Sequence, residues 1–152
     1  MVLKKVNIYT DGACSGNPGI GGWAAILRYN GNEKRISGFV KNTTNNRMEL
    51  LALINSLGLL KECCDITVFS DSKYVVDSIC RGWAESWKKS GWIRKKKLVP
   101  NSDLWEVLLK LISNHKVSLN WVRGHSGHSE NEECDKMAVA EIQNYKDKLC
   151  QE

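Results

Sequence analysis

Three strand-like segments precede the first long helical segment, and strands and helices alternate after it. The segments 23–29 and 34–40 flank Asn30-Gly31, a dipeptide typical of a two-residue β-hairpin. Strands that are connected through a helix pack parallel to each other, because the chain crosses over the sheet between them. This order predicts one α/β domain in which an antiparallel hairpin continues into parallel strands, with helices on both faces of a mixed five-stranded sheet.

The boundaries of the other elements follow from periodicity, turn residues and capping residues. Further strands are expected at 5–11, 65–70 and 117–122, and the glycine-rich residues 12–22 are expected to form a loop. Helices are expected from a cap at 42–44 to about Leu60, directly after Asp71-Ser72, around 82–90 and around 102–113. Ser129 and Glu132 form a capping box that opens the last helix, after a loop at 123–128.

The length of 152 residues is typical of one domain, and we expect residues 1–152 to form it. The longest apolar-rich run, 50–60, is interrupted by Asn, Ser and Gly and is shorter than the roughly 20 residues that span a bilayer. Asn7 and Asp11 interrupt any apolar signal region near the N-terminus. We therefore expect a cytoplasmic protein with no membrane partner, acting as a monomer.

The six cysteines raise the alternatives of disulfide bonds and a zinc site. They lie at 14, 63, 64, 80, 134 and 150, with no CxxC pair among them. In the absence of a signal segment, free thiols in a reducing cytosol are expected. A zinc site built from His125, His128 and Cys134 stays open as an alternative, since the two histidines have the spacing of half a site.

Positive charge is concentrated in one stretch of the chain, 81–97, although the whole sequence carries a net charge of only +5. That stretch contains seven basic residues, one acid and three of the six tryptophans. Trp83 and Trp87 are spaced to share one face of a helix, with Lys88 and Lys89 beside them. A cationic, aromatic-lined element suits contact with nucleic acid, although a solvated basic face over buried tryptophans would give the same pattern.

Four acidic residues lie at positions that are unusual for a charged side chain. Asp11 and Asp71 end two strands, while Glu49 and Asp135 lie on helix stripes of small or apolar residues. Ligands gather at the carboxyl ends of parallel strands, so the four can converge on one crevice. Carboxylates that close repel one another, and Mg²⁺ or Mn²⁺ would relieve the repulsion. Two such ions, roughly 3.5–4 Å apart, suit the hydrolysis of a phosphodiester.

Four segments carry the signature of a known family, in the order YTDGACSGNPGIGGWA, TTNNRMELLA, FSDSKYV and WVRGHSGHSENEECDKMA. Through them the chain resembles type 1 ribonuclease H, or ribonuclease HI, in its bacterial single-domain form, nearly from end to end. The resemblance implies a ribonuclease H-like fold, with strands one to three antiparallel and strands four and five parallel to the first. It also implies a single catalytic domain that hydrolyses the RNA strand of RNA–DNA hybrids with two Mg²⁺ ions, or Mn²⁺ as a substitute, leaving 5′-phosphate and 3′-hydroxyl ends.

The same resemblance implies roles for individual residues. The metal-binding carboxylates match Asp11, Glu49, Asp71 and Asp135, and the histidine that assists proton transfer or product release matches His125. The residues that line the minor groove of the hybrid match Cys14, Asn17, Asn45 and Asn46, and Lys73 stands at a further substrate-binding position where many relatives have Gln. A phosphate pocket for the DNA strand matches Thr44 and Asn101, and a basic protrusion that contacts this strand matches Trp83, Trp87, Lys88 and Lys89.

Three departures from the family pattern leave the four acids untouched. Lys73 replaces a Gln of many relatives, Asn42 stands where an Arg often holds the DNA phosphate, and 74–83 is one residue longer. We expect these departures to alter affinity or site preference while the chemistry stays intact.

Two other classes of protein remain as alternatives. Another nuclease or polynucleotidyl transferase can share the fold, and a non-catalytic module could bind hybrids without a complete set of carboxylates. Each acid, taken alone, could also be a turn or cap residue, or could pair with a neighbouring base such as Arg47 or Lys136.

Overall fold

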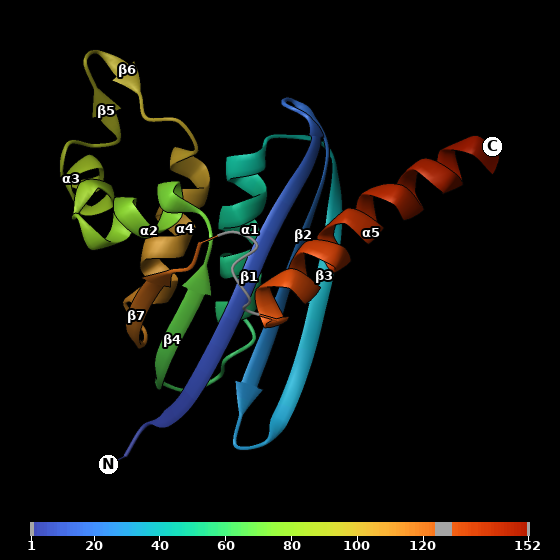
Figure 1. Cartoon of the computed structure of the whole chain (residues 1–152). Coiled ribbons are helices and arrows are strands. Elements are labelled where there is room, and N and C mark those ends of the chain that lie inside the picture. The colour runs from blue at the N-terminus through green and yellow to red at the C-terminus, as the bar shows by residue number, and fades with distance from the viewer. Residues whose placement is uncertain (1, 124–128, 152) are drawn as a thin grey trace.

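A five-stranded mixed sheet runs through the middle of the molecule (Figure 1), which is a computed structural model describing residues 2–123 and 129–151. Its strands are β1 (Lys4–Gly16), β2 (Gly19–Tyr29), β3 (Asn32–Thr43), β4 (Cys64–Ser70) and β7 (Lys116–Trp121), in the spatial order β3-β2-β1-β4-β7. The first three strands are antiparallel, whereas β4 pairs parallel with β1 and β7 parallel with β4. This topology confirms the predicted fold class.

Helices cover both faces of the sheet (Figure 1). They are α1 (Asn45–Leu57), α2 (Lys73–Cys80), α3 (Trp83–Lys89), α4 (Ser102–Ile112) and α5 (Ser129–Gln151). Neighbouring strand residues face opposite sides, so Ile8 packs with Leu53 of α1 and Trp105 of α4, while Tyr9 packs with Ala138 of α5. The sheet therefore separates a larger core under α1 and α4 from a smaller one under α5.

The glycine-rich segment 12–22 is not a loop, and the prediction of one was wrong. It extends β1 and β2 into a long antiparallel ladder that continues to Gly16 opposite Gly19. The glycines allow the backbone of two helices to approach the strands closely. A Cβ on Gly22 would lie 2.0 Å from the Ala138 carbonyl oxygen of α5, and one on Gly12 would lie 2.6 Å from the Glu49 nitrogen of α1. Glycine in a strand often has this function, so the two helices can lie directly on the strand backbone.

Replacing Gly22 by Ala is expected to destabilise the fold by about 1–3 kcal/mol or more, because the new methyl group collides with helix backbone rather than with a flexible side chain. Chemical denaturation of the variant measures this loss. Gly58 provides the matched control, since its φ of −64° suits Ala and a Cβ there would lie 3.3 Å from the nearest atom, the Ile54 oxygen, rather than 2.0 Å. Equal stability losses for the two substitutions would contradict the close approach of α5 to β2.

Other boundaries differ from the prediction in detail. The Asn30-Gly31 hairpin is confirmed, with both residues at positive φ. A second hairpin was not predicted: β5 (Ile93–Arg94) and β6 (Lys97–Leu98) pair through Lys95 and Lys96, which have φ of 51° and 65°. Lysine gives no turn signal, so local sequence could not indicate this hairpin.

The end of α1 and the cap of α5 also differ from the prediction. α1 ends at Leu57, where Gly58 forms the cap, rather than at about Leu60. α5 begins at Ser129, as predicted, but the Ser129 hydroxyl contacts the Glu130 carboxylate at 2.8 Å, and the described residues show no capping hydrogen bond between Ser129 and Glu132.

The cysteines and the apolar content of the helices can be compared with the predictions. All six cysteines lie in the described part of the chain, and each is a free thiol. No helix in the described ranges 2–123 and 129–151 is both long and apolar enough to cross a membrane.

Candidate metal and active site

Two of the four predicted acids lie side by side because of the register between β1 and β4. Thr10 pairs with Ser70 in the parallel ladder, and Asp11 and Asp71 are the next residues along each chain. β4 ends at Ser70, so Asp71 leaves the strand at its carboxyl end while Asp11 continues along β1. The crevice at the carboxyl ends of parallel strands, which the sequence indicated, is thus formed.

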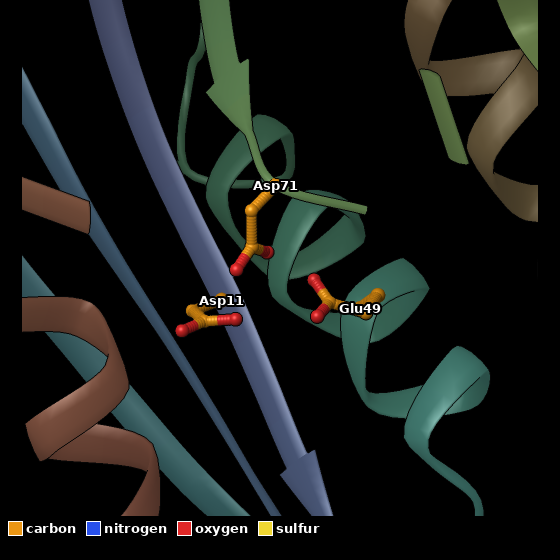
Figure 2. A group of neighbouring side chains, drawn as sticks. All are labelled: Asp11, Glu49 and Asp71. Atoms are coloured by element: carbon orange, nitrogen blue, oxygen red, sulfur yellow. The ribbon is translucent and has the colours of Figure 1, made fainter. Parts of the chain in front are cut away.

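The third acid, Glu49, comes from α1 and reaches the pair because that helix lies directly on β1. Gly12 leaves room for the helix backbone beside Asp11. The Thr44 hydroxyl caps the helix by accepting a hydrogen bond from the Arg47 nitrogen at 3.3 Å. One carboxylate oxygen from each of the three acids lies within 4.8 Å of the others, and Figure 2 shows the three groups pointing toward one another.

The electrostatics of this cluster oppose full ionisation. Asp11 is 6% exposed and Glu49 5% exposed. Burial, followed by the charge of Asp71, raises the pKa of Asp11 to about 7, although the Gly12 N–H donates to its Oδ1 at 2.9 Å. Burial and the charges of Asp11 and Asp71 also raise the pKa of Glu49 well above its usual value.

These residues fit a divalent cation of the Mg²⁺ class. All the donors are carboxylate oxygens, which hard cations prefer. The Glu49 Oε2 atom is buried and has no hydrogen-bond partner among the described residues, so it retains a lone pair for a ligand. A cation bound among the three groups would replace their mutual repulsion with attraction.

The carboxylates face a polar cavity of about 380 Å³. It is lined by Asp11, Gly12, Asn45, Asn46, Glu49, Asp71, Ser72, Lys73, Tyr74, Asn131, Glu132 and Asp135. Asp135 of α5 is half-buried in the wall of this cavity but is not part of the tight group of three. The structure therefore brings all four predicted acids to one cavity, three of them into close contact.

Asn131 holds the first turns of α5 to the two strands that carry Asp11 and Asp71. Its side-chain nitrogen donates to the Thr10 oxygen at 3.3 Å and to the Phe69 oxygen at 3.0 Å. Sequence reasoning missed this residue, although its position four residues before Asp135 places both on one helix face. Its partners are backbone atoms far away in sequence, which no local pattern could reveal.

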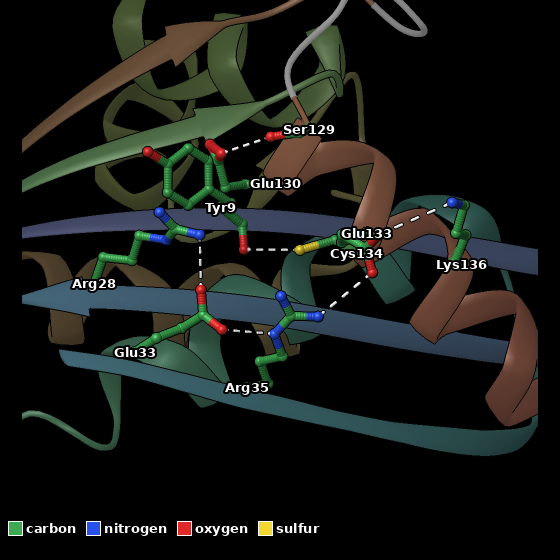
Figure 3. Close-up of polar contacts among 9 residues, drawn as sticks. All are labelled: Tyr9, Arg28, Glu33, Arg35, Ser129, Glu130, Glu133, Cys134 and Lys136. Carbon is green, nitrogen blue, oxygen red and sulfur yellow. Dashed lines mark hydrogen bonds and ion pairs between the residues drawn. The ribbon is translucent and has the colours of Figure 1, made fainter. Parts of the chain in front are cut away.

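Further contacts fix the same end of α5 on the sheet (Figure 3). The buried Cys134 thiol donates to the Tyr9 oxygen at 3.3 Å. Arg35 of β3 bridges Glu33 at 2.8 Å and Glu133 of α5 at 3.4 Å. Because these contacts surround Asp135 in sequence, they set where its carboxylate enters the cavity.

The alternative ion pairs of Glu49 and Asp135 with neighbouring bases are not formed among the described residues. Arg47 pairs with Asp103 through two contacts of 2.9 and 2.8 Å rather than with Glu49. Lys136 lies 3.9 Å from Glu133 rather than on Asp135. Burial raises the pKa of the Cys134 thiol to about 12, and this thiol contacts the Tyr9 oxygen; the other two residues of the alternative zinc site, His125 and His128, lie outside the described residues.

The predicted minor-groove residues lie around the start of α1 and the β1–β2 turn, with Lys73 across the cavity. The Cys14 thiol donates to the Thr43 oxygen at 3.3 Å, and the Asn17 side-chain oxygen accepts from the Asn45 nitrogen at 3.3 Å. Asn45, Asn46 and Lys73 line the acidic cavity itself.

The predicted phosphate-pocket residues and the basic protrusion extend from the cavity on the side of α3. Asn101 has a φ of 63°, accepts from Arg47 at 3.4 Å and donates to the Tyr74 hydroxyl at 3.1 Å. Trp87 packs on Trp105, with ring centroids 5.9 Å apart, whereas Trp83 is 44% exposed. Lys88 and Lys89 are exposed in the last turn of α3.

His125 lies outside the described residues, as does His128, so the structure says nothing about either side chain. The role of His125 therefore stays a prediction.

The sheet topology and the carboxylate-lined cavity match what the sequence predicts for a ribonuclease H-like fold. A profile of the RNase H family matches residues 3–143. The chain belongs to the RNase H family.

Individual relatives agree with that assignment. The protein named ribonuclease H in Desulforamulus reducens is 55% identical over 139 residues, 91% of this chain and 87% of that protein. The crystal structure of LC9-RNase H1, a type 1 RNase H with the type 2 active-site motif, has a TM-score of 0.84 at 31% identity and covers 95% of this chain and 74% of that chain. LC11-RNase H1 in complex with an RNA/DNA hybrid has a TM-score of 0.72 at 21% identity over 92% of this chain and 98% of that chain, which shows a shared fold.

Proposed function

We propose that this chain is an endoribonuclease that hydrolyses the RNA strand of RNA–DNA hybrids and leaves 5′-phosphate and 3′-hydroxyl ends. Its membership of the RNase H family supports the substrate class. The observation that carries the chemistry is the convergence of Asp11, Glu49 and Asp71 in one polar cavity. We propose that residues 1–152 form one catalytic domain, which acts as a monomer in the cytoplasm.

The acidic residues would hold two Mg²⁺ ions, with Mn²⁺ as a substitute. Asp11 and Asp71 would be the central ligands, Glu49 would hold one ion, and Asp135 would hold the other, more exchangeable one. Bound there, the ions supply activation of a water and stabilisation of the leaving oxygen. The buried Glu49 oxygen without a partner supports this assignment, because an unsatisfied carboxylate oxygen in a closed site is costly without a ligand.

The chain's own residues would orient the hybrid at this site. Asn45 and Asn46 open onto the cavity from the first turn of α1, and Cys14 and Asn17 lie close to that turn. Polar groups in a minor groove can contact 2′-hydroxyls, which is how a protein distinguishes RNA from DNA. We propose that Thr44 and Asn101 contact a phosphate of the DNA strand, and that His125 assists proton transfer or product release.

A specificity assay tests this function. Hybrid, duplex RNA and duplex DNA of one sequence, each labelled on either strand, are incubated with the protein in Mg²⁺. We expect cleavage of the RNA strand of the hybrid alone, with products that a 5′-phosphate-dependent exonuclease degrades. Cleavage of duplex DNA would indicate another nuclease on the same fold, and binding of hybrid without cleavage would indicate a non-catalytic module.

The basic protrusion makes a separate prediction. Reversing the charges of Lys88 and Lys89 to Glu should raise the KM for hybrid about tenfold at low salt, with little change in kcat, because these exposed lysines would contact phosphates remote from the scissile bond. The slope of log KM against log salt should fall by about 2, one for each lost phosphate contact. Lys61 and Lys148 are exposed lysines outside this element, and their double reversal is the matched control. An unchanged salt slope in the Lys88/Lys89 variant would refute the contact.

A further inference from the structure

Trp121, the last residue of β7, touches both the backbone of a site carboxylate and a cation in the cavity wall. It pairs with Ser70 at the end of β4, and the next residue, Val122, donates its N–H to the Ser70 oxygen at 2.9 Å. The Trp121 indole nitrogen donates to the Asp71 backbone oxygen at 3.1 Å. The ammonium of Lys73 lies over the indole ring, 5.1 Å from its centroid.

The exposure of Trp121 shows that the apolar core does not account for its position. The residue is 42% exposed, unlike Trp105, which is fully buried in the core. Trp121 keeps one face of its ring accessible and donates its N–H inward. Tryptophans with this combination of an apolar face and a bonded N–H are common at binding surfaces. Its two contacts both lead to residues that line the acidic cavity, Asp71 and Lys73.

The contact with Lys73 has a physical consequence. Lys73 is the first residue of α2 and is exposed, so its side chain would otherwise sample many rotamers. A tryptophan face attracts an ammonium group electrostatically and keeps the cation at one place. A cation that is already ordered loses less entropy when it binds a phosphate, so the stacked arrangement favours association with a polyanion.

The contact with Asp71 acts on the carboxylate through its backbone. Asp71 lies just beyond the end of β4, where the sheet ladder no longer determines the chain path on its own. The indole N–H fixes the carbonyl of this residue, which limits rotation of the peptide that precedes the α2 cap Ser72. Small displacements of a reacting group have large effects on rate.

We propose that Trp121 is a positioning residue with two effects: it fixes the Asp71 backbone for catalysis, and it holds Lys73 ready for a phosphate of the bound hybrid. The inference rests on the proposed function and assigns a residue to the same site.

Three variants separate the two effects. Trp121→Phe keeps an aromatic face but removes the N–H donor, Trp121→Leu removes both, and Lys73→Gln removes only the cation.

The first experiment does not depend on activity. In the NMR spectrum of the wild-type protein, the indole ring current should move the Lys73 side-chain methylene signals upfield. The upfield shift should persist in Trp121→Phe and disappear in Trp121→Leu, with thermal unfolding confirming that both variants are folded. Lys73 signals at ordinary positions in the wild-type protein would overturn the stacking.

The second experiment measures hybrid cleavage at several salt concentrations. Lys73→Gln should raise KM about threefold to tenfold at low salt and reduce the salt slope by about 1. Trp121→Phe should lower kcat about twofold to tenfold, as expected for one lost hydrogen bond, with KM nearly unchanged. Trp121→Leu should show both changes, and its KM should rise little further when Lys73→Gln is added, because the two residues act on one contact.

The outcomes separate this inference from the proposed function. If the wild-type protein does not cleave hybrids, the proposed function fails and the catalytic part of the inference fails with it, while the NMR experiment still decides the stacking. If the wild-type protein cleaves hybrids but Trp121→Leu keeps wild-type kcat and KM, only the inference is overturned. An altered Mg²⁺ requirement with an unchanged salt slope in Lys73→Gln would also overturn it, since Lys73 would then act on the carboxylates instead of on phosphate.

Discussion

Replacing Asp71 by Asn is expected to reduce the turnover of hybrid cleavage by at least about a thousandfold while the fold is retained. The substitution keeps the size of the side chain but removes the negative charge that would hold a cation between Asp11 and Glu49. The helix that follows is capped by Ser72 rather than by Asp71, and the Asp71 carbonyl that Trp121 contacts is unchanged. Single-turnover cleavage in Mg²⁺ measures the loss, and far-ultraviolet circular dichroism checks the fold.

Asp65 provides the control for this substitution. It is a half-buried aspartate near the start of β4, the strand that Asp71 follows, at the end opposite to the acidic cavity. Asp65→Asn should retain wild-type turnover. Cleavage by Asp71→Asn at a rate similar to that of the Asp65 variant would remove Asp71 from the proposed site.

Replacing Asp11 by Asn should stabilise the metal-free protein at neutral and alkaline pH, although it should abolish activity. The folded-state pKa of Asp11 is raised from 3.8 to about 7, chiefly by burial and then by the charge of Asp71. A raised carboxyl pKa means that the native state binds protons more tightly than the unfolded state, so stability is lost as pH rises from about 4 to about 7. Asparagine carries no charge, and the variant should gain up to about 4 kcal/mol over the wild type above pH 7.

Urea denaturation in EDTA between pH 4 and pH 8 measures this difference, which should shrink as the pH falls. Asp103 gives a control of the opposite sign, because its pKa is lowered by the hydrogen bonds from Arg47 and its ionised form is stabilising. Asp103→Asn should therefore be neutral or slightly destabilising at pH 7. Added Mg²⁺ should raise the free energy of unfolding of the wild type, because the cation binds only the folded carboxylates. The difference in stability between the wild type and Asp11→Asn should therefore become smaller. A less stable Asp11→Asn variant at pH 8 would contradict the electrostatic description of the cavity.

Most of the acidic site could be predicted because each acid is tied to a regular element. The parallel pairing of β1 with β4 was predictable from the chain order, and it places Asp11 beside Asp71. The strand end predicted at Asp11 was wrong, because β1 continues to Gly16 and only its parallel pairing with β4 ends at Thr10. Glu49 and Asp135 were recognisable because a charge on an apolar stripe is unusual. The distance between the three groups was not predictable, since it depends on the approach of α1 to β1 at Gly12.

The errors share a physical origin in contacts between distant segments. Glycines in 12–22 were interpreted as turn residues, whereas tertiary packing uses them to admit α1 and α5 to the strand backbone. Asn131 and Trp121 donate to backbone oxygens 50 or more residues away, and no periodicity signals such a partner. The resemblance to a known family supplied the residues that bind substrate, whose individual roles remain predictions.

The most direct test of the proposed function is the dependence of strand cleavage on divalent metal. A hybrid with different labels on its RNA and DNA strands is incubated with wild-type protein that has been treated with EDTA, and Mg²⁺ is then added in steps. The carboxylate cavity predicts no cleavage before the addition, and cleavage of the RNA strand alone that rises to saturation with Mg²⁺. Full cleavage in EDTA, or cleavage of the DNA strand, would contradict the proposal that Asp11, Glu49 and Asp71 form a metal-dependent site for RNA hydrolysis.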